Sequence, residues 1–203
     1  PSPPHHHPLS SVWRCHATGL TPPPRSSCRT NRGLGGAPFP AARYFPTVVY
    51  YAATGKIYVI GGFDASFTEA NQTWEYDPVA NTWNTTRANI PVAMAGSATS
   101  IVGQYIYLAG SFNDANASTL HYRYDIVANS WATRAAVPVP VFQAVGGAIG
   151  GKTYLAGGGN PAEASQRAQT GPPGTAVPGA PTTSYNTTYI YDIASDSWAN
   201  GPN

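Results

Sequence analysis

A short apolar run that ends in small residues recurs three times along the chain. The run is Ile57–Gly62 (IYVIGG) in the first unit, Ile106–Ser111 (IYLAGS) in the second and Thr153–Gly158 (TYLAGG) in the third. A tyrosine–aspartate pair and a tryptophan follow each run. The tyrosine and the tryptophan are always seven positions apart, as Tyr76 and Trp83, Tyr124 and Trp131, and Tyr191 and Trp198. A repeat of about 50 residues predicts a propeller or a related array of small sheets.

Each unit divides into four short strands. In the first unit, β-branched, aromatic and apolar segments predict strands over Phe45–Ala53, Lys56–Gly61, Thr73–Asp77 and Thr82–Thr86. Turns are expected at Thr54-Gly55 and Pro78–Asn81. Asp77 is placed to accept hydrogen bonds from the amides of the second turn. The second unit shows the same pattern from Met94 and the third from Phe142.

The three units resemble the Kelch repeat, in which four hydrophobic residues and a double glycine precede a spaced tyrosine and tryptophan. The resemblance covers about residues 37–203, and three motifs in phase make it specific. In two departures, Gly110-Ser111 replaces a double glycine, and only the first unit has the Pro-x-x-Arg lead-in, as Pro40–Arg43. The resemblance implies an all-β fold, a Kelch-type β-propeller with three four-stranded antiparallel blades around a central channel. The blades are expected at about residues 37–88, 89–136 and 137–203.

The repeated tyrosines and tryptophans have a structural role in this interpretation, because they supply large apolar faces between neighbouring blades. The aspartates that follow each tyrosine are assigned to turns. The resemblance implies a ring of six or seven blades, so three blades leave the ring open. We therefore expect the chain to be a fragment of a longer propeller. In the alternative, two chains close a six-bladed ring, and exposed apolar faces favour such self-association.

Composition separates the first 36 residues from the rest. Charged residues make up 10% of the chain, against about 25% in a typical soluble domain. The composition excludes a helical bundle, because the chain contains 21 Gly, 20 Pro and 12% aromatic residues. Residues 1–43 hold five arginines and no acid, whereas residues 44–203 carry a net charge of −3. Residues 1–36 are rich in Pro, Ser and Arg without periodicity, which predicts a disordered tail and no nucleic-acid partner. No apolar run reaches the roughly 18 residues of a membrane span.

Functional residues are expected where the three units differ. The connections after the glycines differ most, and they are expected on one face of the disc, together with the connections between units. Arg87 and Arg134, which follow the fourth strands, are assigned to this face. The candidate binding residues are Phe63, Asp64, Phe67, Arg87, Phe112, Asn113, Asp114, Arg134, Glu163 and Arg167. The matching Phe63 and Phe112 either contact a ligand or anchor their loops on the blade. The last two candidates lie in the loop Gly159–Ser184, whose composition favours disorder.

Two classes of function follow from this pattern. The absence of a catalytic constellation favours a non-catalytic module that binds a protein or a glycan through these loops. The alternative is part of a carbohydrate-active Kelch enzyme, galactose-oxidase-like or sugar-epimerase-like, with its catalytic residues in missing blades. A galactose-oxidase copper site needs a tyrosine crosslinked to cysteine and two histidines. The repeats hold no cysteine and one histidine, His121, which is expected on the surface, so neither a metal nor another cofactor is predicted.

The cellular location is indicated by composition alone. The cysteines, Cys15 and Cys28, both lie in the tail, where a disulfide between them is possible and no C-x-x-C motif indicates zinc. Four N-x-S/T sequons occur at Asn71, Asn84, Asn116 and Asn186. Low charge and a main body free of cysteine favour an extracellular or cell-surface protein.

Overall fold

The computed structural model describes residues 35–113, 116–160 and 183–201. The chain divides into two units, Pro1–Gly35 and Gly36–Asn203, and every described strand belongs to the second. The predicted tail up to residue 34 lies outside the described residues, together with both cysteines. The described residues form strands and no helix, which confirms the all-β prediction, and so none of them forms a helix that could cross a membrane.

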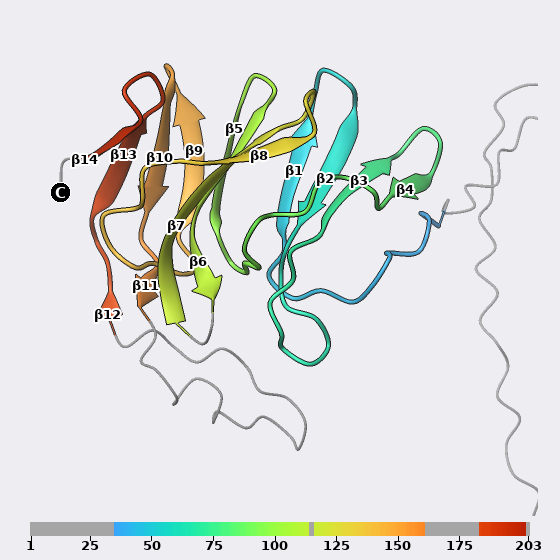
Figure 1. Ribbon diagram of the computed structural model, residues 1–203, viewed down its shortest axis with the longest axis horizontal. Helices are drawn as coiled ribbons and strands as arrows, with labels where there is room; N and C mark the ends of the chain where they lie inside the picture. Colours follow the sequence, from blue (N-terminus) through green and yellow to red (C-terminus); the bar gives the residue numbers. More distant parts are fainter. Residues whose placement is uncertain (1–34, 114–115, 161–182, 202–203) are drawn as a thin grey trace, which may run out of the picture. The chain divides into compact units, whose positions relative to one another are not determined.

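Three antiparallel sheets of four strands each make up the second unit (Figure 1). The first sheet consists of β1 (Thr47–Tyr51), β2 (Lys56–Ile60), β3 (Thr73–Asp77) and β4 (Thr82–Asn84). The second consists of β5 (Ala98–Val102), β6 (Tyr105–Asn113), β7 (Asn116–Asp125) and β8 (Ser130–Thr133). The third consists of β9 (Val145–Ile149), β10 (Lys152–Ala156), β13 (Thr188–Asp192) and β14 (Ser197–Asn200). A small two-stranded sheet pairs β11 (Gly159–Asn160) with β12 (Thr183–Ser184).

The strands predicted in the first unit are present, with the first and last strands shorter than expected. Tyr76 on β3 lies opposite Trp83 on β4, so the repeated aromatic pair is a cross-strand pair. Asp77 accepts hydrogen bonds from the amides of Val79 and Ala80 at 2.8 and 3.0 Å, as predicted. Asp125 and Asp192 hold the matching turns of the other two sheets in the same way. The repeated aspartates therefore stabilise turns.

Glycine allows the chain to leave the first sheet after β2. Gly61 and Gly62 both have positive φ, and a Cβ atom on Gly61 would lie 2.4 Å from the carbonyl oxygen of Met94. In the second sheet, serine replaces the second glycine. There β6 continues through the buried Ser111 after a register shift, and pairs with β7 over a longer hairpin. The second sheet therefore has an extended strand pair with a register shift where the first sheet has a long connection.

Apolar side chains fill the space between neighbouring sheets. Between the first two sheets, the buried Tyr58 and Tyr124 have ring centroids 6.1 Å apart, within a cluster that includes Ile106 and Leu108. Between the second and third sheets, a second cluster includes Leu155. The inner strands also pack closely, because a Cβ atom on Gly146 of β9 would lie 2.3 Å from the carbonyl oxygen of Thr99 on β5. The three sheets are thus joined by continuous apolar cores.

A repeated set of hydrogen bonds ties each sheet to the segment that precedes it, and we call it the intersheet clasp. In the second sheet, the Tyr124 hydroxyl donates to Asn129 Oδ1 at 2.7 Å, and the amide of Ala88 donates to the same oxygen at 2.9 Å. Trp131 Nε1 then donates to the carbonyl oxygen of Ala88 at 2.8 Å. The turn residue whose side chain accepts these bonds, Asn129 here, has positive φ, as do Asn81 and Asp196 at the matching places of the other two sheets.

The same clasp forms in the other two sheets. Tyr76, Asn81, Trp83 and Ala37 form it in the first sheet, and Tyr191, Asp196, Trp198 and Ala135 form it in the third. The prediction that the repeated tyrosines and tryptophans are structural is therefore confirmed.

The sheets have two distinct ends. At the hairpin end, which is the upper edge in Figure 1, lie the turns between the first two and between the last two strands of each sheet, including residues 52–55 and 78–81. At the connection end, the lower edge, lies the long β2–β3 connection of residues 61–72. The clasps belong to the hairpin end, because their acceptor side chains come from its turns.

Candidate functional site

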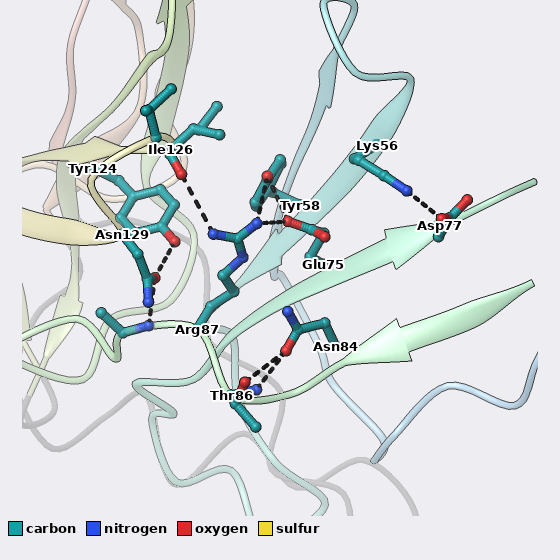
Figure 2. Close-up of polar contacts among 12 residues, drawn as sticks. Lys56, Tyr58, Glu75, Asp77, Asn84, Thr86, Arg87, Tyr124, Ile126 and Asn129 are labelled. Carbon is teal, nitrogen blue, oxygen red and sulfur yellow. Dashed lines mark hydrogen bonds and ion pairs between the residues drawn. The ribbon is translucent and has the colours of Figure 1, made fainter. Parts of the chain in front are cut away.

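Arg87 lies between the first and second sheets, where it takes part in a polar cluster (Figure 2). Its guanidinium forms an ion pair with Glu75 on β3, and the Tyr58 hydroxyl donates to the same carboxylate at 2.6 Å. The pKa of Tyr58 is raised above its usual value, mainly because the hydroxyl is buried and to a lesser extent because it donates to Glu75. A second Arg87 nitrogen donates to the carbonyl oxygen of Ile126 at 3.4 Å. The cluster therefore links two sheets through charge-assisted bonds.

This arrangement corrects the expected position of Arg87. The cluster borders a pocket of about 280 Å³ whose lining includes Thr54 and Val127, both from turns at the hairpin end. The carboxylate of Glu75 draws the guanidinium toward that end, so Arg87 does not join Phe67 and Asp64 on the connection face. The sequence could not show this, because the partner of an arginine depends on which strand faces it.

Arg134 occupies the matching place after β8 and is likewise held between sheets. Its guanidinium lies 3.9 Å from the carboxylate of Asp196, which belongs to the clasp of the third sheet. The residue that corresponds to Glu75 in the second sheet is Arg123, whose guanidinium lies 4.4 Å from the Tyr105 ring centroid. Arg134 thus takes its carboxylate from the neighbouring sheet, again at the hairpin end.

Phe63 and Phe112 anchor loops in the structure. They are 2% and 5% exposed, and their ring centroids lie 5.5 Å apart. Together with Ala95 and Phe142 they form a buried cluster at the connection end. Of the two roles considered for these phenylalanines, the structure therefore supports that of an anchor that packs its loop on the blade. Asn113 lies at the end of β6 and donates to the carbonyl oxygen of Ala93 at 3.0 Å. Asp114, Glu163 and Arg167 lie outside the described residues.

The connection end of the first sheet presents aromatic side chains to solvent. Tyr44, 49% exposed, stacks on Phe67, with ring centroids 5.2 Å apart and planes at 17°. Phe45 is 42% exposed, and both Phe45 and Phe67 have positive φ. Gly96 and Gln143, which match Phe45 in the other two sheets, have positive φ as well, so the strain at Phe45 belongs to the repeat. The strain at Phe67 is particular to this loop, and strain of that kind concentrates at functional sites. We call the surface formed by Tyr44, Phe45 and Phe67 the aromatic platform.

Asp64 shapes the loop that carries Phe67. Its Oδ1 accepts hydrogen bonds from the backbone amides of Ser66 at 2.8 Å and Thr68 at 3.0 Å. These bonds, the one from Thr68 most strongly, hold the pKa of the Asp64 carboxyl below its usual value. The Phe67 amide donates to the Asp64 carbonyl oxygen at 3.0 Å. The Tyr44 and Phe63 backbones exchange two hydrogen bonds, which place the loop beside Tyr44. The sequence identified Asp64 and Phe67 but missed Tyr44 and Phe45, whose only signal is an aromatic pair ahead of the first strand.

His121 is buried, not on the surface as expected. It is 1% exposed, because it faces the third sheet and packs between Tyr191 and Trp198 with ring centroids 4.4 and 5.1 Å away. Its Nδ1 lies 2.9 Å from the carbonyl oxygen of Ala135. A carbonyl oxygen only accepts hydrogen bonds, so Nδ1 carries the proton and donates it. The other ring nitrogen, Nε2, is buried without a hydrogen-bond partner among the described residues. Burial lowers the pKa of His121 to about 4, so the ring is neutral at pH 7. Within the described ranges, no three His, Cys, Asp or Glu residues gather as a metal site would need.

Comparisons with known proteins agree with this architecture. A Kelch motif model matches residues 52–86, which span the β1–β2 turn through β4. A search of the curated proteins returns no match. Among 167 matching chains of solved structures is YjhT, a Kelch-type propeller, with a TM-score of 0.63 and 18% sequence identity. The match covers 82% of this chain and 54% of the YjhT chain, so this chain spans about half the length of that structure. The first sheet thus carries a Kelch motif, and the described sheets share the fold of a Kelch-type propeller.

Proposed function

We propose that this Kelch domain is a non-catalytic binding module that engages a protein or glycan ligand through the connection end of its sheets. One observation carries the proposal: Tyr44, half exposed to solvent, stacks on Phe67, which has positive φ in its loop. Large aromatic faces left in solvent are typical of binding sites, because they bury much area at little entropic cost. Kelch repeats typically mediate binding, which agrees with this role.

The binding residues in this proposal differ partly from those expected from sequence. Phe67 and Asp64 remain, and Tyr44 and Phe45 join them. Arg87 and Arg134 contribute to the joints between sheets, and substituting them is expected to affect folding before binding.

A glycan array and a peptide array, probed with the full chain, test the proposal. A ligand is expected whose signal falls at least about tenfold in the double variant Tyr44→Ala/Phe67→Ala. The matched control is Val79→Ala/Val127→Ala, which removes two exposed apolar side chains from turns at the hairpin end. Equal binding by the native chain and the Tyr44/Phe67 variant would place the site elsewhere.

We further propose that blades of the same kind cover the two outermost sheet faces. Val48 and Tyr50 of β1 are each 60% exposed, and Val145 and Ile149 of β9 are more exposed still. The matching strand β5 lies between neighbours, and its large apolar residues are not exposed. In a longer propeller these faces meet further blades of the same polypeptide and not a second copy of this chain. On this proposal the chain by itself is expected to have the mass of one copy in light scattering. A compact species of twice that mass would indicate a ring of two copies instead.

A further inference from the structure

We infer that the aromatic platform binds a basic side chain, an arginine above all, from a partner polypeptide, with Asp64 and Glu69 as its acidic partners. The inference rests on the proposed function and narrows its ligand. Among the connections of the described sheets, only this one combines exposed stacked rings with carboxylates.

The aromatic side of the site suits a planar cation. Tyr44 and Phe67 lie nearly parallel, and the half-exposed Tyr44 leaves part of the stack open to solvent. A guanidinium stacks on such faces and is attracted by the negative potential of the ring. The chain already uses this contact, because the guanidinium carbon of Arg43 lies 4.8 Å from the Trp74 ring centroid.

Two carboxylates beside the platform supply negative charge. Asp64 is partly exposed and remains ionised at neutral pH. Its Oδ1 accepts hydrogen bonds from loop amides, while no hydrogen bond to Oδ2 is present among the described residues. Glu69 pairs with Phe63 across the loop, and its Oε1 is buried without a hydrogen-bond partner. Because that oxygen is closed to solvent, Glu69 contributes negative charge to the loop, whereas Asp64 can contact a ligand directly.

The charge balance of the loop is negative. Arg43 is the cation that acts on Asp64, and its guanidinium is already engaged by Gln72 at 2.7 Å and by Trp74. The matching place in the second sheet is Phe112-Asn113, with a buried ring and a neutral amide bonded to the backbone. An acidic ligand is therefore disfavoured at the platform, and a neutral one leaves both carboxylates unused.

The test measures binding of the full chain to fluorescein-labelled peptides that differ only at three central positions, which are Arg, Lys, Gln or Glu in a Gly/Ser background. The Arg peptide is expected to bind most tightly, followed by Lys, with Gln and Glu at least about tenfold weaker. Raising the salt concentration is expected to weaken the Arg peptide's binding.

Two variants and one matched control locate the site. Phe67→Ala and Asp64→Asn are each expected to weaken the Arg peptide's binding by about tenfold. Asp192→Asn is the control, because Asp192 also accepts two turn amides and its loss changes the net charge equally, but it lies at the hairpin end. A far-ultraviolet spectrum and a melting curve of each variant confirm that it is folded.

The outcomes separate this inference from the proposed function. Equal binding of the Arg and Gln peptides, or an equal loss in Asp64→Asn and Asp192→Asn, overturns the inference. If only a neutral oligosaccharide binds, and Phe67→Ala abolishes that binding, the inference fails while the proposed function stands. If Phe67→Ala leaves every measured binding unchanged, both fail.

Discussion

The two ends of the sheets differ in how strictly they repeat. At the hairpin end, all three sheets form the same intersheet clasp from a tyrosine, a turn residue with positive φ, a tryptophan and an alanine backbone. At the connection end, the first sheet has a long looped connection with exposed rings, whereas the second continues as a paired hairpin. Residues that repeat here hold neighbouring sheets together, so the residues that do not repeat are the ones free to recognise a ligand.

The largest effect is expected at a clasp. Trp131→Ala removes a ring that packs on Tyr124 with centroids 4.8 Å apart and donates to Ala88. The loss of a large aromatic from such a joint costs about 4 kcal/mol in the free energy of unfolding. Urea denaturation measures it, with the exposed Val127→Ala as the control, expected within about 0.5 kcal/mol of the native chain. A similar small change for both variants would show that the clasp contributes little to stability.

The second prediction distinguishes the two joints between sheets by their response to pH. His121 lies at the joint between the second and third sheets, whereas the buried Thr73 lies at the matching place of the first sheet. The pKa of His121 falls from 6.5 to about 4 because burial penalises its charged form. Between these values the unfolded chain binds more protons, so stability is complete above pH 6.5 and falls as the pH decreases toward 4.

The size of the pH effect follows from the shift in pKa. The contribution of His121 amounts to about 3.5 kcal/mol at most, at about 1.4 kcal/mol per pH unit. His121→Thr, which copies the first sheet, is expected to flatten the unfolding free energy between pH 6.5 and 4. The groups that face His121 are Tyr107 from its own sheet, Arg134, and Tyr191 and Asp196 from the third sheet. An unchanged slope in the variant would assign the pH dependence to other groups.

The sequence predicted the repeated part of the molecule well and the unique part poorly. Tyr76, Trp83 and Asp77 recur with fixed spacing, and so their shared role could be inferred from the pattern. Arg87 and Arg134 also match each other, but their partners, Glu75 and Asp196, lie on different sheets. Which face of a strand meets a neighbouring sheet depends on packing, which also explains why His121 is buried. Backbone strain at Phe67, in the connection unique to the first sheet, leaves no mark in the sequence.

A third prediction separates binding from stability at the connection end. Phe67→Gly removes a ring of the aromatic platform and replaces a phenylalanine at φ 57° with the residue that adopts this conformation most easily. Ligand affinity is expected to fall about tenfold, while the melting temperature stays the same or rises. Calorimetry of the ligand found on the arrays, alongside a thermal melt, gives both quantities. A joint fall in affinity and stability would mean that Phe67 serves the fold rather than the ligand.

The smallest effect is expected where one clasp differs from the others. Asp196→Asn restores the residue type of Asn81 and Asn129 and keeps an oxygen to accept the Tyr191 hydroxyl and the Ala135 amide. It removes the ion pair with Arg134, whose atoms lie 3.9 Å apart on a partly exposed surface, so the unfolding free energy is expected to fall by less than about 1 kcal/mol. Urea denaturation at pH 7 checks this, and a loss of several kcal/mol would make the charge essential to the third clasp.

Hydrogen exchange of the full chain, with and without a ligand from the arrays, most directly tests whether the connection end recognises a ligand while the hairpin end holds the sheets together. The ligand is predicted to slow exchange of the backbone amides in residues 44–45 and 63–69. The turn amides of Val79, Val127 and Ala194, which the repeated aspartates hold, are predicted to exchange at unchanged rates. Protection confined to those turns, with none in residues 63–69, would contradict the account.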